Sequence, residues 1–255
     1  MVRTHVGHGT ALPTFLTKTP QSVTRHLPTS TAINRWFLWA FVLWVIVGGI
    51  LWAVFDRREI FERINSVHTS WADNFLNAYT ALGDGTAIYL ILLTLFGAPA
   101  FRNLWFALTA AACNLIPALV VQLLKALVAA PRPLRYWEQD NAWIHLADGW
   151  RRLEGHHSFP SGHTAGAFSL ACFLSILLPK RFAPLGLLIF FMALGVGYSR
   201  LYLAAHFYAD VYVGSIVGTL VTLLVYAAMR AVQPRFYDRN APDTTLDDDH
   251  DDEVR

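Results

Sequence analysis

Six stretches of this chain are long and apolar enough to cross a bilayer as helices, and this constrains the fold more than any other feature. A spanning helix needs about 20 mostly apolar residues. Helices satisfy their own backbone polar groups within lipid, whereas the strands of a barrel would alternate apolar and polar residues. The stretches are Arg35–Phe55, Gly85–Phe101, Leu104–Leu127, Gly162–Leu178, Phe182–Val196 and His206–Met229. They predict an all-α fold, an integral membrane bundle of six transmembrane helices.

The composition agrees with a membrane protein. Of the 255 residues, 55% are hydrophobic and only 15% are charged, whereas soluble domains carry about 25% charged residues. A formal net charge of +2 is too small to indicate a nucleic-acid partner. Cys113 and Cys172 both lie within apolar stretches, so we interpret them as small buried hydrophobic residues; a disulfide or a metal pair is the alternative.

The chain shows no internal repeat, which predicts one membrane domain over residues 35–230. Residues 1–34 contain no Asp or Glu and no apolar period, and we interpret them as a mobile N-terminal arm, with a transit peptide as the alternative. Residues 231–255 end in a run of acidic residues, which predicts a disordered tail. Between the first two spans, apolar residues recur every three or four positions from Ile60 to Tyr79, a pattern that favours interfacial helices.

Two further features lie outside the predicted spans. Trp137, Trp143 and Trp150 lie among charged residues in the connection 130–160. We interpret them as an aromatic belt at the level of the lipid headgroups; the alternative is a surface that contacts the lipid part of a substrate. Asp84, within the turn Gly83–Gly85, is interpreted as a turn and helix start.

Three clusters of polar residues lie at the ends of the predicted spans. The first is "KALVAAPRP", where Lys125 precedes Arg132 and the flanking prolines end the helix and hold Arg132 in an extended loop. The second is "FPSGHTAG", where Ser161 is placed to cap a helix whose free N–H groups form an anion site. The third is "YSRLYLAAHFYADVYVG". With six spans, all three clusters fall on one side of the membrane.

The third cluster contains a histidine and an aspartate four residues apart. On one helix face His206 and Asp210 could meet, and the carboxylate would then fix the tautomer of the imidazole. The free nitrogen could ligate a metal, act as a general base or attack as a nucleophile. The neighbouring cations Lys125, Arg132 and Arg200 would repel a divalent metal ion but would hold an anion. The residues therefore favour a phosphate site and predict no metal and no other cofactor.

Two histidines beside a phosphate favour phosphoryl transfer through a covalent intermediate. In this hypothesis His206 attacks phosphorus, Asp210 orients it, and His163 first donates a proton to the leaving oxygen and then accepts one from water. Basic side chains and the helix start neutralise the charge on the transferring group. The predicted phosphate-binding residues are Lys125, Arg132, Ser161, Gly162 and Arg200.

The three clusters resemble the signature of the type-2 phosphatidic acid phosphatase (lipid phosphate phosphatase) superfamily, which is K-x6-R-P, P-S-G-H and S-R-x5-H-x3-D. The spacing agrees at Lys125–Pro133, at Pro160–His163 and at Ser199–Asp210. The resemblance extends from about Arg35 to Met229. It implies a metal-independent enzyme with a phosphohistidine intermediate, which in bacteria works on the outer face of the inner membrane. Soluble vanadium-dependent haloperoxidases are similar in signature, but six spans argue against that activity.

The distribution of basic residues orients the predicted bundle. Once Lys125, Arg132 and Arg200 are set aside, Lys and Arg are more numerous on the face opposite the clusters. The positive-inside rule then places both termini in the cytoplasm and the site outside, facing the periplasm of a bacterial inner membrane.

The leading hypothesis is a membrane phosphatase that hydrolyses a lipid phosphate or diphosphate monoester. A lipid phosphotransferase would use the same chemistry. A non-catalytic transporter or scaffold would place ionisable residues at helix midpoints, whereas here they lie at helix ends. Phosphatidylglycerol phosphate, undecaprenyl diphosphate, phosphatidate and lipid A all fit such a site, and the residues carry no information on oligomeric state. His156 and His157 are interpreted as loop histidines without a catalytic part, and Tyr202 and Tyr208 as part of the helix interface. Arg151 and Arg152 are interpreted as solvated charges; the alternative is contact with a second phosphate or a headgroup.

Overall fold

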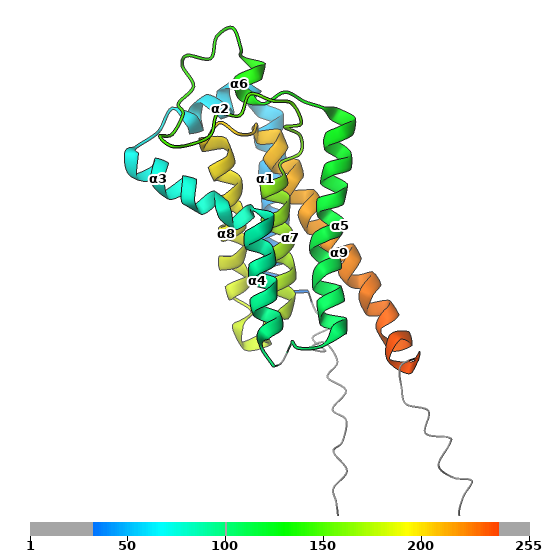
Figure 1. Cartoon of the computed structure of the whole chain (residues 1–255). Coiled ribbons are helices and arrows are strands. Elements are labelled where there is room, and N and C mark those ends of the chain that lie inside the picture. Colours follow the sequence, from blue (N-terminus) through cyan, green and yellow to red (C-terminus); the bar gives the residue numbers. More distant parts are fainter. Residues whose placement is uncertain (1–32, 100, 240–255) are drawn as a thin grey trace, which may run out of the picture.

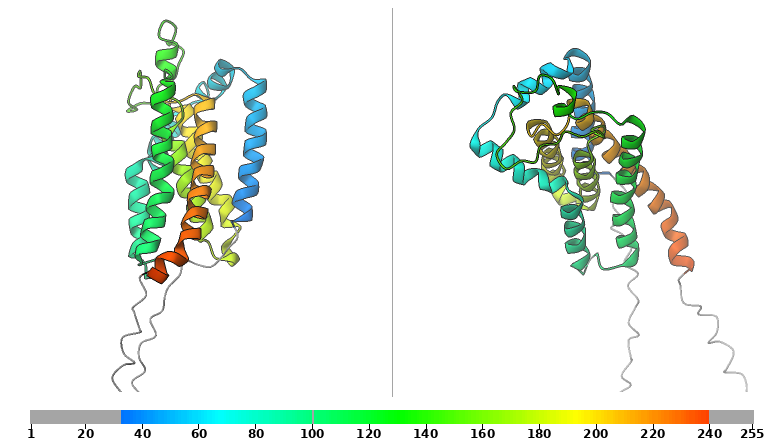
Figure 2. Two further views of the ribbon diagram at one scale, coloured as in Figure 1. Left: turned by 90° about the vertical axis from the view of Figure 1, so that its right-hand side faces the viewer. Right: turned by 45° about the horizontal axis from the view of Figure 1, so that its top comes forward.

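The computed structural model describes residues 33–99 and 101–239, and its regular structure within those ranges is helical, without strands. The longer helices stand side by side (Figures 1 and 2): α1 (Arg35–Val54), α4 (Gly85–Gly97), α5 (Leu104–Val128), α7 (Gly162–Leu177), α8 (Leu185–Tyr202) and α9 (Tyr208–Arg239). The shorter elements are α2 (Arg57–Asn65), α3 (Ser70–Tyr79), η1 (Thr80–Gly83), α6 (Pro133–Tyr136) and η2 (Lys180–Phe182). The predicted all-α membrane fold is confirmed.

Four helices within the described ranges are long and apolar enough to cross a membrane, namely α1, α5, α8 and α9. A fifth candidate consists of α3 with η1 and α4, which qualify together but meet at a bend of 60°. The apolar helix α7 has only 16 residues. Most of its side chains are buried among its neighbours, so little of it has to face lipid. The count of six spans stays a prediction.

Two predicted spans have wrong boundaries. The fifth span was expected to end at Val196, but α8 continues to Tyr202 and carries Arg200 in its last turn. Arg200 packs inside the protein, so its charge does not end the helix. The sixth span was expected to run from His206 to Met229, but α9 runs from Tyr208 to Arg239. Most of the predicted N-terminal arm and C-terminal tail lies outside the described residues.

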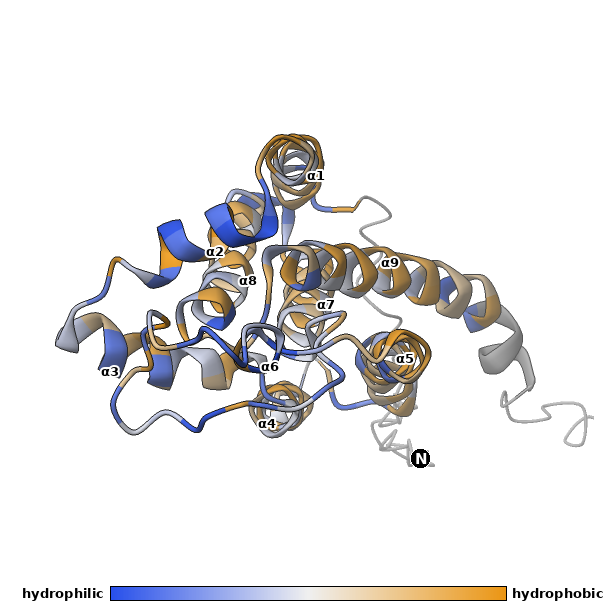
Figure 3. Cartoon of the chain, turned by 90° about the horizontal axis from the view of Figure 1, so that it is seen from above, coloured by the Kyte–Doolittle hydropathy of each residue, from blue (hydrophilic) through white to orange (hydrophobic). Residues whose placement is uncertain are grey.

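Helices α2 and α3 lie across one end of the bundle (Figure 1). Hydrophilic residues gather in α2, α3 and the connections at this end, whereas α1, α5 and α9 are mainly hydrophobic (Figure 3). Phe61 of α2 is fully buried, and the rings of Trp137, Trp143 and Phe207 pack around it. Two of the three tryptophans in the long connection therefore help to fix that connection onto α2.

Helix α7 lies at the centre of the bundle, and its backbone comes into direct contact with that of α9. A Cβ atom on Gly218 would lie 2.3 Å from the carbonyl oxygen of Ala165, and one on Gly214 would lie 2.7 Å from that of Ser161. Two glycines four residues apart allow membrane helices to approach this closely. The same contact lets the N–H of Ser161 donate to the carbonyl of Asp210 at 2.9 Å. The first turns of α7 and α9 are thereby joined.

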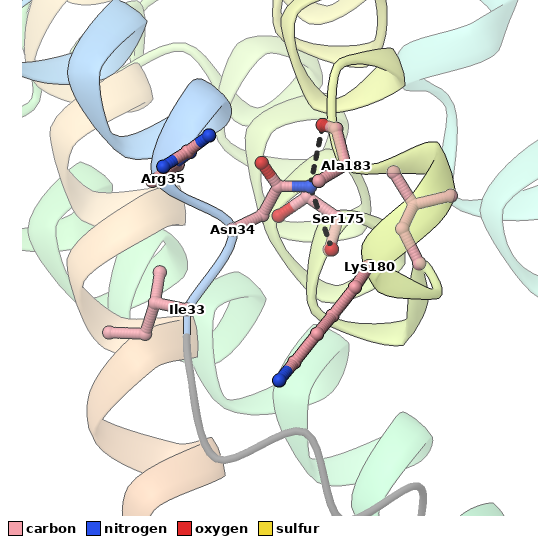
Figure 4. Close-up of a pocket in the computed structure, with 7 residues that line it drawn as sticks. Ile33, Asn34, Arg35, Ser175, Lys180 and Ala183 are labelled. Atoms are coloured by element: carbon pink, nitrogen blue, oxygen red, sulfur yellow. Dashed lines mark hydrogen bonds between the residues drawn. The ribbon is translucent and has the colours of Figure 1, made fainter.

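Asn34 holds the opposite end of the bundle together. Its side-chain oxygen caps α1, and Nδ2 donates to the carbonyls of Ser175 and Ala183 at 3.4 and 3.0 Å (Figure 4). A hollow of about 330 Å³ beside Asn34 is lined in part by Arg35 and Lys180. These contacts fix the start of α1 against the end of α7, far from the polar clusters.

Cys113 of α5 and Cys172 of α7 are both buried in the core as free thiols. Their interpretation as small buried hydrophobic residues is confirmed.

Candidate active site

The three polar clusters meet at the end of the bundle where α5 and α8 finish and α7 and α9 begin (Figure 1). Hydrogen bonds connect the first cluster to the loop before α7, that loop to Asp210, and the end of α8 to the chain around His206. The structure thus brings together every residue that the sequence analysis selected for the site. The roles assigned to them remain predictions.

His206 and Asp210 are in contact, but not as two residues of one helix. Nδ1 of His206 lies 3.3 Å from Oδ2 of Asp210. His206 belongs to the connection 203–207, so the predicted helical pairing is wrong. Ala204 has a left-handed φ of 51°, which turns the chain after α8. Asp210, in the first turn of α9, accepts the backbone N–H of Phe207 at 2.9 Å, so one carboxylate both starts the helix and contacts the imidazole.

Ser158 completes this group, and the sequence analysis did not select it. Its hydroxyl donates to Oδ2 of Asp210 at 2.5 Å and lies 3.3 Å from Nδ1 of His206. The Ser158 N–H donates to the carbonyl of Ala130 at 2.9 Å, which ties the loop before α7 to the end of α5. The only signal in the sequence was its place within "HHSFPSGH".

The imidazole of His206 is held uncharged. It is only 2% exposed. Burial lowers the pKa of His206, and Asp210 opposes this shift while Arg200 and Arg132 add to it. With Nδ1 directed at a carboxylate, the proton of the neutral ring belongs on Nδ1, and Nε2 carries the free electron pair. This is the form in which a histidine acts as a nucleophile.

Lys125 and Arg132 are held at the site by backbone carbonyl groups. Nζ of Lys125 donates to the carbonyl of His157 at 2.6 Å, and Nη1 of Arg132 donates to that of Ala205 at 2.9 Å. Arg132 has the predicted extended backbone, with φ of −77° and ψ of 163°. Helix α5 already ends at Val128, before the prolines that were expected to end it.

Arg200 is 3% exposed and is held by two residues that the sequence analysis did not connect with it. Nη1 donates to Oγ1 of Thr80 at 2.7 Å, and the guanidinium lies 5.2 Å from the centroid of the Trp150 ring. Its Nε has no hydrogen-bond partner among the described residues. Trp150 thus contacts a site residue, a role that neither interpretation of the tryptophans included.

His163 is the more accessible of the two site histidines, with 32% of its side chain exposed. It lies in the first turn of α7, whose predicted cap is confirmed because Oγ of Ser161 accepts the N–H of Thr164. Asp84 caps α4 through the N–H of Thr86, as expected for a helix start. Its second carboxylate oxygen, Oδ2, lies 4.0 Å from Nε2 of His163.

A cavity of about 240 Å³ opens between α4, α5 and α7, next to His163. Gly162 and His163 line it where α7 begins, and Ile88, Ala118 and Val121 contribute apolar surface. Asn114 and Gln122 add polar groups, so the cavity places a mainly apolar wall beside the site.

The other residues near the site have structural contacts. His157 contacts the backbone of Lys125 through Nδ1 at 2.9 Å, and Arg152 pairs with Glu154 on the surface. The hydroxyl of Tyr202 donates to Asp73, and that of Tyr208 to the carbonyl of Gly48. Across the described ranges, no group of three or more His, Cys, Asp or Glu side chains could hold a metal ion.

Comparisons with known proteins agree on one family. The model of the PAP2 superfamily matches residues 103–234, which is more than half of the chain. Lipid phosphate phosphatase 1 of Arabidopsis thaliana is 34% identical over 133 residues, covering 44% of this chain and 41% of the plant protein. The lipid A 4'-phosphatase of Bacteroides thetaiotaomicron is 29% identical over 171 residues, covering 64% and 72%.

A similar fold has been solved by crystallography. The structure of LpxE from Aquifex aeolicus superposes with a TM-score of 0.56 at 27% identity, and covers 68% of this chain and 97% of that protein. The chain spans less than half of the plant relative but most of the two bacterial ones.

Proposed function

The chain belongs to the PAP2 superfamily, and we propose that it is a metal-independent membrane phosphatase that hydrolyses a lipid phosphate or diphosphate monoester through a phosphohistidine. The observation that carries this proposal is the contact of 3.3 Å between Nδ1 of His206 and Oδ2 of Asp210, with Arg132 and Arg200 close to it. A neutral, oriented imidazole among cations is suited to attack a phosphate.

In the first step, Nε2 of His206 forms a bond to phosphorus while the bond from phosphorus to the lipid oxygen breaks. His163 gives its proton to that oxygen, and the lipid alcohol leaves, or the lipid monophosphate when the substrate is a diphosphate. In the second step, water attacks the phosphohistidine, His163 takes a proton from the water, and the bond between Nε2 and phosphorus breaks. Inorganic phosphate leaves, and both histidines return to their starting state.

The phosphate is held by cations and by the start of α7. Lys125, Arg132 and Arg200 offset the charge of the phosphate oxygens. Their guanidinium and ammonium groups donate hydrogen bonds that phosphate oxygens can accept. The hydroxyl of Ser161 and the N–H of Gly162 belong to a helix start, which favours an anion. In this proposal the positive charge of the protein replaces the metal ion that many phosphatases use.

The membrane arrangement follows from the same proposal. Residues 35–230 form a catalytic domain whose six spans are α1, α4, α5, α7, α8 and α9, with residues 1–34 as an arm and an acidic tail at the C-terminus. Both termini lie in the cytoplasm, and the site faces the outside of a bacterial inner membrane.

A lipid substrate is supported by the mainly apolar cavity beside the site. The phosphate binds at the two histidines, and part of the acyl region lies in the cavity between α4, α5 and α7. The names of the relatives from Arabidopsis and Bacteroides, a lipid phosphate phosphatase and a lipid A 4'-phosphatase, support a phosphorylated lipid.

The proposal is tested with purified enzyme in detergent containing excess chelator. A panel of phosphatidate, phosphatidylglycerol phosphate, undecaprenyl diphosphate and lipid A is assayed for free phosphate. We expect release from at least one lipid, undiminished by chelator, and a protein-bound phosphate that is labile in acid and stable in base. His206→Ala should abolish both signals.

Three results would count against the proposal. These are no release from any lipid, release that chelator removes, or a phosphoenzyme that persists in His206→Ala. Transfer of the phosphate to a second lipid without free phosphate would instead indicate a phosphotransferase with the same intermediate.

A further inference from the structure

Asp84 uses its two carboxylate oxygens differently. Oδ1 accepts the N–H of Thr86 at 2.8 Å and so caps α4. Oδ2 is not used by the cap and lies 4.0 Å from Nε2 of His163. The backbone N–H of Thr86 holds the pKa of Asp84 below its ordinary value, so the carboxylate is charged near neutral pH. A helix cap needs only one of these oxygens, and the second faces the predicted proton donor.

The approach of Asp84 to His163 is built into the fold. A Cβ on Gly83 would lie 2.6 Å from the carbonyl oxygen of His163, so η1 rests directly on the backbone of α7. Thr80, at the other end of η1, accepts a hydrogen bond from Arg200. Contacts to α7 and α8 therefore hold η1 at both ends, and they fix the position of Asp84 relative to His163.

Asp84 also balances the charge around His163. Among the described residues, the charged groups that act on this histidine are Lys125 at the end of α5, Arg132 before α6, Arg200 in α8 and Asp84 before α4. Burial and the three cations oppose a proton on the ring, and only the carboxylate favours one. The cations that would bind a phosphate would thus weaken the proton donor if Asp84 were absent.

We propose that Asp84 is a positioning residue for His163, whose carboxylate holds the ring in the orientation and charge state needed to protonate the leaving oxygen. The inference rests on the proposed function. The separation of 4.0 Å is longer than a hydrogen bond, and contacts of this kind shorten when substrate binds. Asp84 takes no proton and forms no bond to phosphorus; it stabilises the imidazolium before the first step and after the second.

Asp84→Asn separates this role from the cap. Asparagine keeps an oxygen that accepts the N–H of Thr86 and caps helices as well as aspartate does, but it has no charge. A capping role alone predicts no change in catalysis, whereas loss of the positioning role should weaken proton donation. The matched control is Asp140→Asn. Asp140 is exposed, and its Oδ2 lies 3.9 Å from Nη2 of Arg58, so this change removes a similar charge contact away from the two histidines.

Two substrates with different leaving groups give the readout. The alkoxide of phosphatidate needs a proton as it leaves, whereas the phenolate of p-nitrophenyl phosphate does not. In single-turnover quench-flow at neutral pH, Asp84→Asn should slow phosphoenzyme formation from phosphatidate by about tenfold or more, since a positioned general acid contributes roughly 10²- to 10⁴-fold. The rate from p-nitrophenyl phosphate should change less than threefold.

The pH profile adds an independent measurement. With phosphatidate, the alkaline limb of the rate should move to lower pH in Asp84→Asn, and Asp84→Glu should restore part of the loss. Equal rates for the variant and the wild type, or an equal loss with both substrates, would overturn the inference while the wild-type phosphoenzyme still supported the proposed function. A wild type that forms no phosphoenzyme from either substrate would overturn both.

Discussion

Oγ of Ser158 lies 2.5 Å from Oδ2 of Asp210, and both side chains are buried. The same oxygen accepts the N–H of Phe207 at 2.9 Å and lies 3.3 Å from Nδ1 of His206. One carboxylate oxygen therefore joins the loop before α7, the start of α9 and the predicted nucleophile. Its position is fixed from two sides by groups other than the histidine.

This arrangement predicts a graded response to substitution. Asp210→Asn should lower kcat by about 10³- to 10⁴-fold, as the equivalent change does in a Ser-His-Asp triad. Ser158→Ala should lower it by only about tenfold, because the Phe207 N–H still holds the carboxylate. Steady-state kinetics with a lipid phosphate measures both. An equal loss in the two variants would show that Ser158 acts in the reaction itself.

The burial of His206 predicts a dependence of stability on pH. The folded state lowers the pKa of His206 from its ordinary value of 6.5. Below about pH 6.5 the unfolded chain takes up a proton that the folded protein excludes, so this group makes stability fall as the pH falls, by at most about 1.4 kcal/mol per pH unit.

Thermal unfolding in detergent measures this effect against His206→Gln, which cannot titrate. Between pH 7 and 5 the Tm of the wild type should fall further than that of the variant. Parallel curves would mean that His206 titrates normally. Nitrogen NMR of labelled histidine should show a neutral ring with the proton on Nδ1 at pH 5.5.

The cavity beside His163 predicts chain-length selectivity. Ala118 lines it from α5, and Ala118→Trp would fill much of a space of about 240 Å³. The ratio of kcat/KM for a long-chain phosphatidate to that for a short-chain one should fall several-fold. Leu119→Trp is the control, since Leu119 is on the same helix and is 65% exposed. A similar fall in both variants would argue against this cavity as the acyl site.

The glycine contact between α7 and α9 predicts a stability effect. The Cβ atom of Gly218→Ala would lie 2.3 Å from the carbonyl oxygen of Ala165, so the helices would have to separate. Overpacking of this kind costs about 1–3 kcal/mol. The Tm in detergent should drop by several degrees, whereas Gly97→Ala, where a Cβ would meet nothing within 4 Å, should not lower it.

The sequence was most informative where a residue pattern is compatible with only one kind of structure. Long apolar runs predicted the starts of α1 at Arg35 and of α5 at Leu104, because about 20 consecutive apolar residues are typical of a membrane-spanning helix. Lys125, Arg132 and His163 were selected because polar clusters at the ends of the predicted spans fall on one side of the membrane. Motif spacing was sufficient to group them, and the structure brings them to one end of the bundle.

The sequence was least informative where a residue's role depends on a partner far along the chain. Thr80 meets Arg200 across 120 positions, and Ser158 meets Asp210 across 52. A serine or threonine side chain can hydrogen-bond to many nearby backbone groups, so the neighbouring residues do not predict such a distant contact. The sequence analysis placed His206 and Asp210 on one helix, because an alanine at position 204 does not indicate that the chain makes a left-handed turn there.

The direct contact between the backbones of α7 and α9 has a consequence for how the enzyme would respond to its membrane. The helix start that carries His163 and the chain that carries His206 meet with no side chain between them to compress. We therefore expect lateral pressure and bilayer thickness to leave the spacing of the two histidines unchanged. Lipid composition would act first on α4, which lies beyond a bend of 60°, and so on access to the cavity that α4 lines rather than on bond-making.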